Sequence, residues 1–163
     1  MSSFAHFDEG DPLTVPMCLS SFLVSVEGEG LLVGTMREHE TWAALDHVAS
    51  GKAALGGWVL PAGHVRIGED PAAAAERIGR DQLRASVRDL RLARVLSYAE
   101  PLAFRGQAMH WDLCFVYDAD LDVPDVPPWF TEIRRVPLTA LRREGFARGH
   151  GDVLADLGLL PEG

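Results

Sequence analysis

The residues best suited to do chemistry lie between Gly57 and Ala85, where a glycine turn, a loop acid and a helix follow one another. Positions 78, 81 and 82 of the helix are three and four residues apart, so their side chains share one helix face. Adjacent carboxylates on such a face are the hard oxygen ligands that Mg²⁺ prefers. Here the face offers Ile78, Asp81 and Gln82, which supply one carboxylate, one amide oxygen and one side chain that cannot coordinate a metal.

The elements around this face can be predicted from local signals. Residues 58–60 form an apolar run typical of a short strand. Asp70 is a good N-cap and Pro71 suits the first helical position, so a helix is expected to begin there and to extend to about Ser86. Gly79 weakens that helix by about 1 kcal/mol relative to alanine.

The rest of the chain alternates apolar runs with turn signals, which predicts further strands. They are expected at residues 18–26, 31–36, 92–98, 109–117 and 132–136, the first two forming a hairpin around 27–30. A helical pattern lies within 38–56, Pro137 begins another helix, and a last one is expected at 152–157; residues 118–128 read as an acidic, proline-containing loop. Strands alternating with helices, mixed with hairpins, predict an α/β fold with a mixed sheet between helices.

Residues 63–85 resemble the signature box of the Nudix hydrolases. In words, that box is Gly, five residues, Glu, seven residues, Arg-Glu, an apolar residue, any residue, Glu-Glu, any residue, Gly and an apolar residue. Gly63, Glu69 and Arg77 fall in register with it. The resemblance implies a structural role for these three residues, with Glu69 and Arg77 bracing the loop against the helix.

The helix face departs from the pattern that it resembles. The three helix glutamates of the box correspond here to Ile78, Asp81 and Gln82, and its closing glycine corresponds to Arg84. The resemblance also implies that the backbone carbonyl of Ala62 is a metal ligand. Ala62, Asp81 and Gln82 are therefore the candidate metal ligands, sufficient for a single weak Mg²⁺ or Mn²⁺ site, and Asp81 and Gln82 are also candidate catalytic residues. The alternative is that Asp81 and Gln82 form a solvated polar helix face.

For the whole chain, the resemblance implies a Nudix-type α/β/α sandwich with a mixed central sheet. The single Nudix domain is expected over residues 17–160, after an N-terminal arm over 1–16. The implied activity is divalent-metal-dependent, MutT-like hydrolysis of a nucleoside diphosphate linked to another group. Because two helix glutamates are missing from this degenerate active site, we expect the activity to be attenuated. The alternative is a catalytically inactive Nudix-fold protein that binds a nucleotide or acts as a regulator.

Acids elsewhere in the chain are candidates to orient a catalytic water. Asp112 lies in an apolar strand, on the face of His110 and Cys114, and an unpaired carboxylate would be costly to bury there. The alternative is that Asp112 pairs with His110 or lies near a strand end. Glu132, at the predicted edge strand, is the second candidate.

Two tryptophans and one arginine are candidates for substrate binding. Trp42 precedes the box and Trp129 lies in a late loop, where aromatic rings offer stacking surfaces for a base or sugar. Arg66, in the box loop, is a candidate for a phosphate contact. The alternatives are that the two rings belong to the core and that Arg66 is an ordinary surface charge.

Composition excludes several classes of function. The formal net charge of -9 in 163 residues argues against nucleic-acid binding, which needs clustered Lys and Arg. No apolar run approaches the roughly 18 residues of a membrane span, and the N-terminus lacks the features of a signal peptide. We therefore expect a cytoplasmic protein with a small nucleotide derivative as its partner. Cys18 and Cys114 lie in apolar runs and are expected to be buried thiols, with a disulfide as the alternative; the arm and the acidic loop are compatible with a homodimer.

Overall fold

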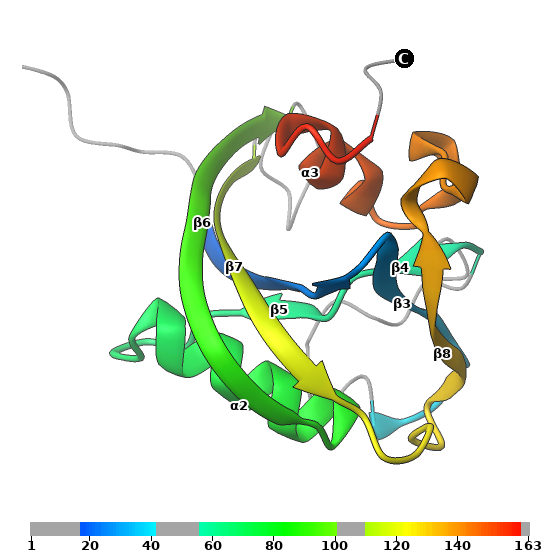
Figure 1. Ribbon diagram of the computed structural model, residues 1–163. Helices are drawn as coiled ribbons and strands as arrows, with labels where there is room; N and C mark the ends of the chain where they lie inside the picture. The colour runs from blue at the N-terminus through cyan, green and yellow to red at the C-terminus, as the bar shows by residue number, and fades with distance from the viewer. Residues whose placement is uncertain (1–16, 42–55, 101–109, 161–163) are drawn as a thin grey trace, which may run out of the picture.

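The computed structural model describes residues 17–41, 56–100 and 110–160, whose strands form two sheets (Figure 1). The first sheet has the order β5-β1-β7-β6. Its strands are β1 (Met17–Val24), β5 (Ala62–His64), β6 (Ser86–Glu100) and β7 (His110–Asp122). β1 runs parallel to β7, whereas β5 and β6 are antiparallel to their neighbours, so the sheet is mixed as predicted.

The second sheet is antiparallel and is built around β3. Its strands are β2 (Val26–Glu27), β3 (Gly30–Met36), β4 (Trp58–Val59) and β8 (Phe130–Pro137). The predicted hairpin is wrong in its first strand, because β1 belongs to the other sheet and the turn joins only β2 to β3. Gly28 makes that turn possible with φ 59°, a left-handed conformation that favours glycine.

Helix α2 (Pro71–Leu83) packs on the first sheet, against β1, β6 and β7. It begins as predicted, since the Asp70 carboxylate accepts a hydrogen bond from the Ala72 N–H at 2.8 Å. It ends three residues earlier than predicted because Arg84 adopts a left-handed conformation, with φ 53°, that stops the helix. The predicted helix after Pro137 is a single 3-10 turn, η2 (Leu138–Ala140), followed by η3 (Arg143–Gly145) and by α3 (His150–Asp156).

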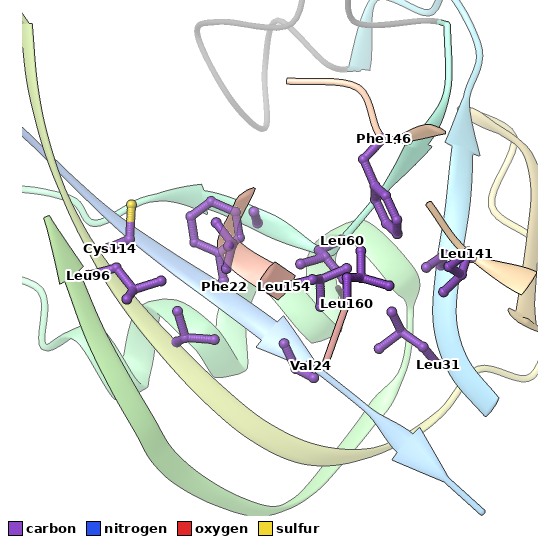
Figure 2. Close-up of a cluster of buried hydrophobic side chains, with 14 of the residues drawn as sticks. Phe22, Val24, Leu31, Leu60, Leu96, Cys114, Leu141, Phe146, Leu154 and Leu160 are labelled. Atoms are coloured by element: carbon purple, nitrogen blue, oxygen red, sulfur yellow. The ribbon is translucent and has the colours of Figure 1, made fainter. Parts of the chain in front are cut away.

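Two clusters of buried side chains hold these layers together. One cluster joins α2 to the first sheet and to one face of β3, and includes Leu23, Ile78, Leu83, Tyr117 and Trp129. The second cluster, shown in Figure 2, brings residues of β1 and β3 together with the C-terminal segment. Its labelled members are Phe22, Val24, Leu31, Leu60, Leu96, Cys114, Leu141, Phe146, Leu154 and Leu160. The first sheet therefore has α2 on one face and the α3 segment on the other.

The predicted acidic loop is wrong over its first five residues. β7 continues to Asp122, with Ala119 and Leu121 buried and the three aspartates between and beside them exposed. This alternation is that of a half-buried strand, and β6 lengthens correspondingly to pair with it. β8 is the edge strand that was predicted, because it pairs only with β3 among the described residues.

Two further predictions can be compared with the structure. Cys18 and Cys114 form no disulfide, as the thiol interpretation predicted, but only Cys114 is fully buried. No helix of the described residues is long and apolar enough to cross a bilayer.

Candidate functional site

An ion pair between Glu69 and Arg77 holds the loop of the box against α2. The Arg77 Nε donates to Glu69 Oε1 at 2.7 Å and Nη2 donates to Oε2 at 2.8 Å. Nη2 also donates to the His64 carbonyl at 2.8 Å, and the Arg66 N–H donates to Glu69 at 2.9 Å. The hydrogen bond from Arg77 is the main cause that lowers the Glu69 pKa to about 2. This geometry is that of a brace, which fixes the path of the loop from β5 to α2.

Close packing of β5 on α2 has turned the first helix position of the box into core. A Cβ placed on Gly63 would lie 3.4 Å from both Ile78 Cγ1 and Gln82 Nε2, which is ordinary van der Waals contact, so these two helix side chains lie directly against β5. Ile78 is 1% exposed and belongs to the α2 cluster. A carboxylate at position 78 would have to be desolvated in the same place, at a large cost unless a cation neutralised it.

Gln82 makes the contact that defines the site. Its Nε2 donates a hydrogen bond of 2.5 Å to the carbonyl oxygen of Ala62, and the side chain is buried at 5% exposure. The opposite amide orientation would set two carbonyl oxygens against each other, so the donor must face Ala62. The Ala62 carbonyl oxygen, which the box resemblance assigns to a metal, therefore accepts a hydrogen bond from the protein itself.

The third helix position, Asp81, is engaged at the surface. Its carboxylate forms an ion pair with Arg80 at 2.8 Å, with the aspartate side chain 34% exposed. Among the described residues, no group of three His, Cys, Asp or Glu side chains is arranged to hold a metal. The residues present thus do not fit the two- or three-metal cluster of a complete box. A single Mg²⁺ on Ala62 and Asp81 would compete with the Gln82 N–H for the carbonyl oxygen and with Arg80 for the carboxylate.

The structure does not bring Asp112 together with the box. Along β7, Asp112 lies on the same face as Cys114 and Val116, which belong to the second cluster with residues of α3. Helix α2 packs on the other face of the sheet. Burial is the main cause that raises the pKa of Cys114 to about 12, and the nearby Asp112 carboxylate adds to it. As a catalytic acid, Asp112 could not act on a group held between α2 and β5.

Glu132 is also engaged away from the box. It pairs in register with Thr35 of β3, whose hydroxyl donates to Oε1 at 3.3 Å. Its Oε2 forms an ion pair with Arg134 at 3.1 Å, and the Arg134 guanidinium in turn lies 5.1 Å from the ring centroid of Trp58. These contacts place Glu132 on the second sheet, in a surface network of its own.

The three predicted substrate-binding residues have different surroundings. Trp42 lies outside the described residues, and Arg66 is exposed in the box loop. Trp129 is 7% exposed, and its Nε1 donates to the backbone carbonyl of Gln82 at 2.8 Å. The Arg84 guanidinium lies 5.0 Å above the Trp129 ring. Trp129 therefore ties the late loop to the last turn of α2, a role that its position in the sequence did not indicate.

Comparisons with known proteins agree with the loop and helix geometry. A family model described as the NUDIX domain matches residues 22–157. A MutT NUDIX hydrolase structure from Burkholderia pseudomallei superimposes with a TM-score of 0.62 and 17% identity, over 85% of this chain and 96% of that one. A NUDIX hydrolase from Nitrosomonas europaea gives 0.59 and 18%, over 88% and 70% of the two chains. A MutT protein from Methanosarcina mazei Go1 gives 0.57 and 16%, over 90% and 96%.

No curated protein matches the sequence. At these identities the structural neighbours establish the fold alone, whereas the domain match covers most of the chain. Together with the braced loop and the strand-to-helix packing, it identifies the chain as a member of the Nudix hydrolase family.

Proposed function

We propose that this chain is a Nudix-fold protein that binds a nucleoside diphosphate derivative without metal-dependent turnover. The observation that carries the proposal is the buried hydrogen bond from Gln82 to the Ala62 carbonyl. A catalytic metal at this place needs that oxygen as a ligand and carboxylates to balance its charge. Here the oxygen already accepts a hydrogen bond from Gln82, Ile78 is buried in the core, and Asp81 is paired with Arg80.

The expected size of the effect follows from the missing groups. Removing one electrostatic contact that stabilises a transition state commonly lowers the rate by about 10²–10³. Positions 78 and 82 both lack a carboxylate, so metal-dependent hydrolysis is expected near background unless the two losses overlap. Ligand binding does not need the same groups, and the braced loop that shapes the site is intact.

Attenuated hydrolysis is the second candidate, and one observation favours it. Asp81 keeps a carboxylate in the last turns of α2 and is partly exposed, so a cation could recruit it if Gln82 rotated away from Ala62. Such a site would hold one Mg²⁺ or Mn²⁺ weakly.

The test measures turnover and binding on the same panel of nucleoside diphosphate sugars, dinucleotides and nucleoside triphosphates. Wild type, Asp81→Ala, Gln82→Glu and Gln82→Met are assayed with Mg²⁺, with Mn²⁺ and with EDTA. We expect a panel member to raise the unfolding temperature of the wild type in EDTA, without metal-dependent turnover. Gln82→Met is the matched control for Gln82→Glu, since it removes the hydrogen bond to Ala62 without adding charge.

The outcomes separate the two candidates. Turnover by the wild type that requires a metal and is lost in Asp81→Ala would establish the attenuated enzyme and sink the binding proposal. Turnover that appears only in Gln82→Glu would show that position 82 is where activity was lost. A wild type that neither binds nor hydrolyses any panel member would contradict both candidates.

A further inference from the structure

The net charge of -9 repels any phosphate-bearing ligand that approaches the box. Without a bound metal, the negative charge of a diphosphate must be met by cationic side chains. Two of the box helix arginines are already engaged, since Arg77 is bound to Glu69 and Arg80 is paired with Asp81. Arg84 is the remaining arginine at the C-terminal end of α2.

Arg84 is in a conformation that its residue type disfavours. It caps α2 with φ 53° and ψ 29°, the left-handed region in which a Cβ is strained and glycine is not. Glycine is the residue that the box pattern has at this position. Strained residues of this kind persist where the surrounding structure holds them, and they are concentrated at ligand-binding sites.

The Arg84 side chain is exposed and held in a fixed place. Its guanidinium carbon lies 5.0 Å from the centroid of the Trp129 ring, and Trp129 is itself fixed by its hydrogen bond to the Gln82 carbonyl and by accepting one at its backbone carbonyl from the Arg37 N–H at 2.9 Å. Within the described ranges, no hydrogen bond or ion pair engages the Arg84 guanidinium. A contact with a ring uses none of the N–H donors for a hydrogen bond, and arginine can present two of these donors to one phosphate in a bidentate manner.

We propose that Arg84 is a phosphate-binding residue at the C-terminal end of the box helix. It supplies the positive charge that metal ions would otherwise provide. The ligand class is a diphosphate group, and the inference rests on the proposed function. The neighbouring segment carries Arg37 and His39 but also the exposed acids Glu38 and Glu40. The contribution of Arg84 is therefore local and bidentate, rather than part of a broad basic patch.

A purely structural role for Arg84 makes a different prediction. As a helix C-cap, an arginine interacts favourably with the last carbonyls, but glycine is the better residue for the left-handed position. Arg84→Gly should then leave the fold intact and leave ligand affinity unchanged.

The experiment is isothermal titration with inorganic pyrophosphate and with ADP, in EDTA. Wild type is compared with Arg84→Gly, Arg84→Lys and Arg148→Gly. Arg148 is the matched control, because it is an exposed arginine that is also left-handed, with φ 60°, and lies outside the box. Both glycine variants thus lose the same charge and relieve the same kind of strain.

We expect Arg84→Gly to weaken binding of both probes by about 10- to 100-fold, the usual contribution of a hydrogen bond between charged groups, with Arg84→Lys intermediate. Arg148→Gly should stay within about twofold of wild type, since Arg148 lies outside the box. Equal weakening in both glycine variants, or no weakening in either, overturns the assignment. Failure of the wild type to bind either probe in EDTA also overturns it, whereas the proposed function is judged separately by turnover and by the wider ligand panel.

Discussion

Glu69→Gln tests how strongly the brace holds the box loop. Glu69 accepts three hydrogen bonds, and the side chains of Glu69 and Arg77 are only 16% and 10% exposed. Lowering the Glu69 pKa from 4.5 to about 2 corresponds to at most about 3 kcal/mol of stability. Because the pair is partly open to solvent, we expect Glu69→Gln to lower the free energy of unfolding by about 2 kcal/mol near neutral pH.

The pH dependence of this loss has a definite sign. A carboxyl whose pKa is lowered in the folded state stabilises the fold in full above its unfolded value, here about 4.5. That stability is lost as the pH falls from there toward about 2, where the folded carboxyl also takes up its proton. The difference between wild type and Glu69→Gln should therefore be constant near neutral pH and shrink below about pH 4.5.

Urea unfolding at a series of pH values measures this difference directly. Glu76→Gln is the control, since Glu76 is an exposed glutamate on the same helix and its substitution should change stability by less than about 0.5 kcal/mol. A cost of Glu69→Gln that is no larger than the control, or that does not change between neutral and acidic pH, would refute the reasoning. Arg77→Met in a double-mutant cycle then isolates the energy of the pair.

Three further substitutions or probes test the packing around the site. Gly79→Ala should destabilise by about 1–2 kcal/mol in thermal unfolding, because its Cβ would clash with Val87 Cγ2 and overpacking outweighs the gain in helix propensity. Val87→Ala in the same chain should restore most of the loss. Trp129→Phe should cost about 1–3 kcal/mol, since it leaves the buried Gln82 carbonyl without its donor. The Cys114 thiol, with its pKa raised to about 12, should react with a disulfide reagent only on unfolding, whereas half-buried Cys18 reacts earlier; equal rates in the two single-serine variants would contradict this.

Local signals in the sequence were sufficient to predict most elements of the fold. The N-cap at Asp70 with Pro71 located the start of α2 to the residue, because capping is decided by neighbouring residues. The end of α2 was predicted too late because Arg84 stops the helix in a left-handed conformation, which an arginine rarely adopts. The pairing of β2 rather than β1 with β3 was missed for a different reason: the apolar run from 18 to 26 is continuous, and only the tertiary fold divides it between two sheets.

The alternation of apolar and acidic residues at the end of β7 was present in the sequence, but the acidic charge of residues 118–122 led to the prediction of a loop. Aspartates are unfavourable in strands on average, which favoured a loop over residues 118–122. In the structure these aspartates are exposed and pair in register with β6, while Ala119 and Leu121 between them are buried. A period of two was the better indicator here than residue propensity, since burial of one face decides the strand.

The candidate site could be predicted in its residues but not in its contacts. Register with the box located Gly63, Glu69 and Arg77, because the loop length between strand and helix is fixed. The bond from Gln82 to Ala62 depends on how closely β5 packs on α2, which is a tertiary property. Asp112 was chosen as an acid in an apolar strand and Glu132 as an acid of the edge strand, but Asp112 lies on the face of the first sheet opposite to α2, and Glu132 lies on the second sheet.

The replacements on the helix face support one another physically. A box with three glutamates concentrates negative charge, which a cation must neutralise. Here Ile78 adds apolar contact, Gln82 satisfies the carbonyl that a cation would have bound, and Asp81 is neutralised by Arg80. Each polar group of the face thus has a partner from the protein itself, so the folded state does not depend on a metal for charge balance. Restoring one glutamate at position 82 would break this balance, because its carboxylate would face the Ala62 oxygen with no donor between them.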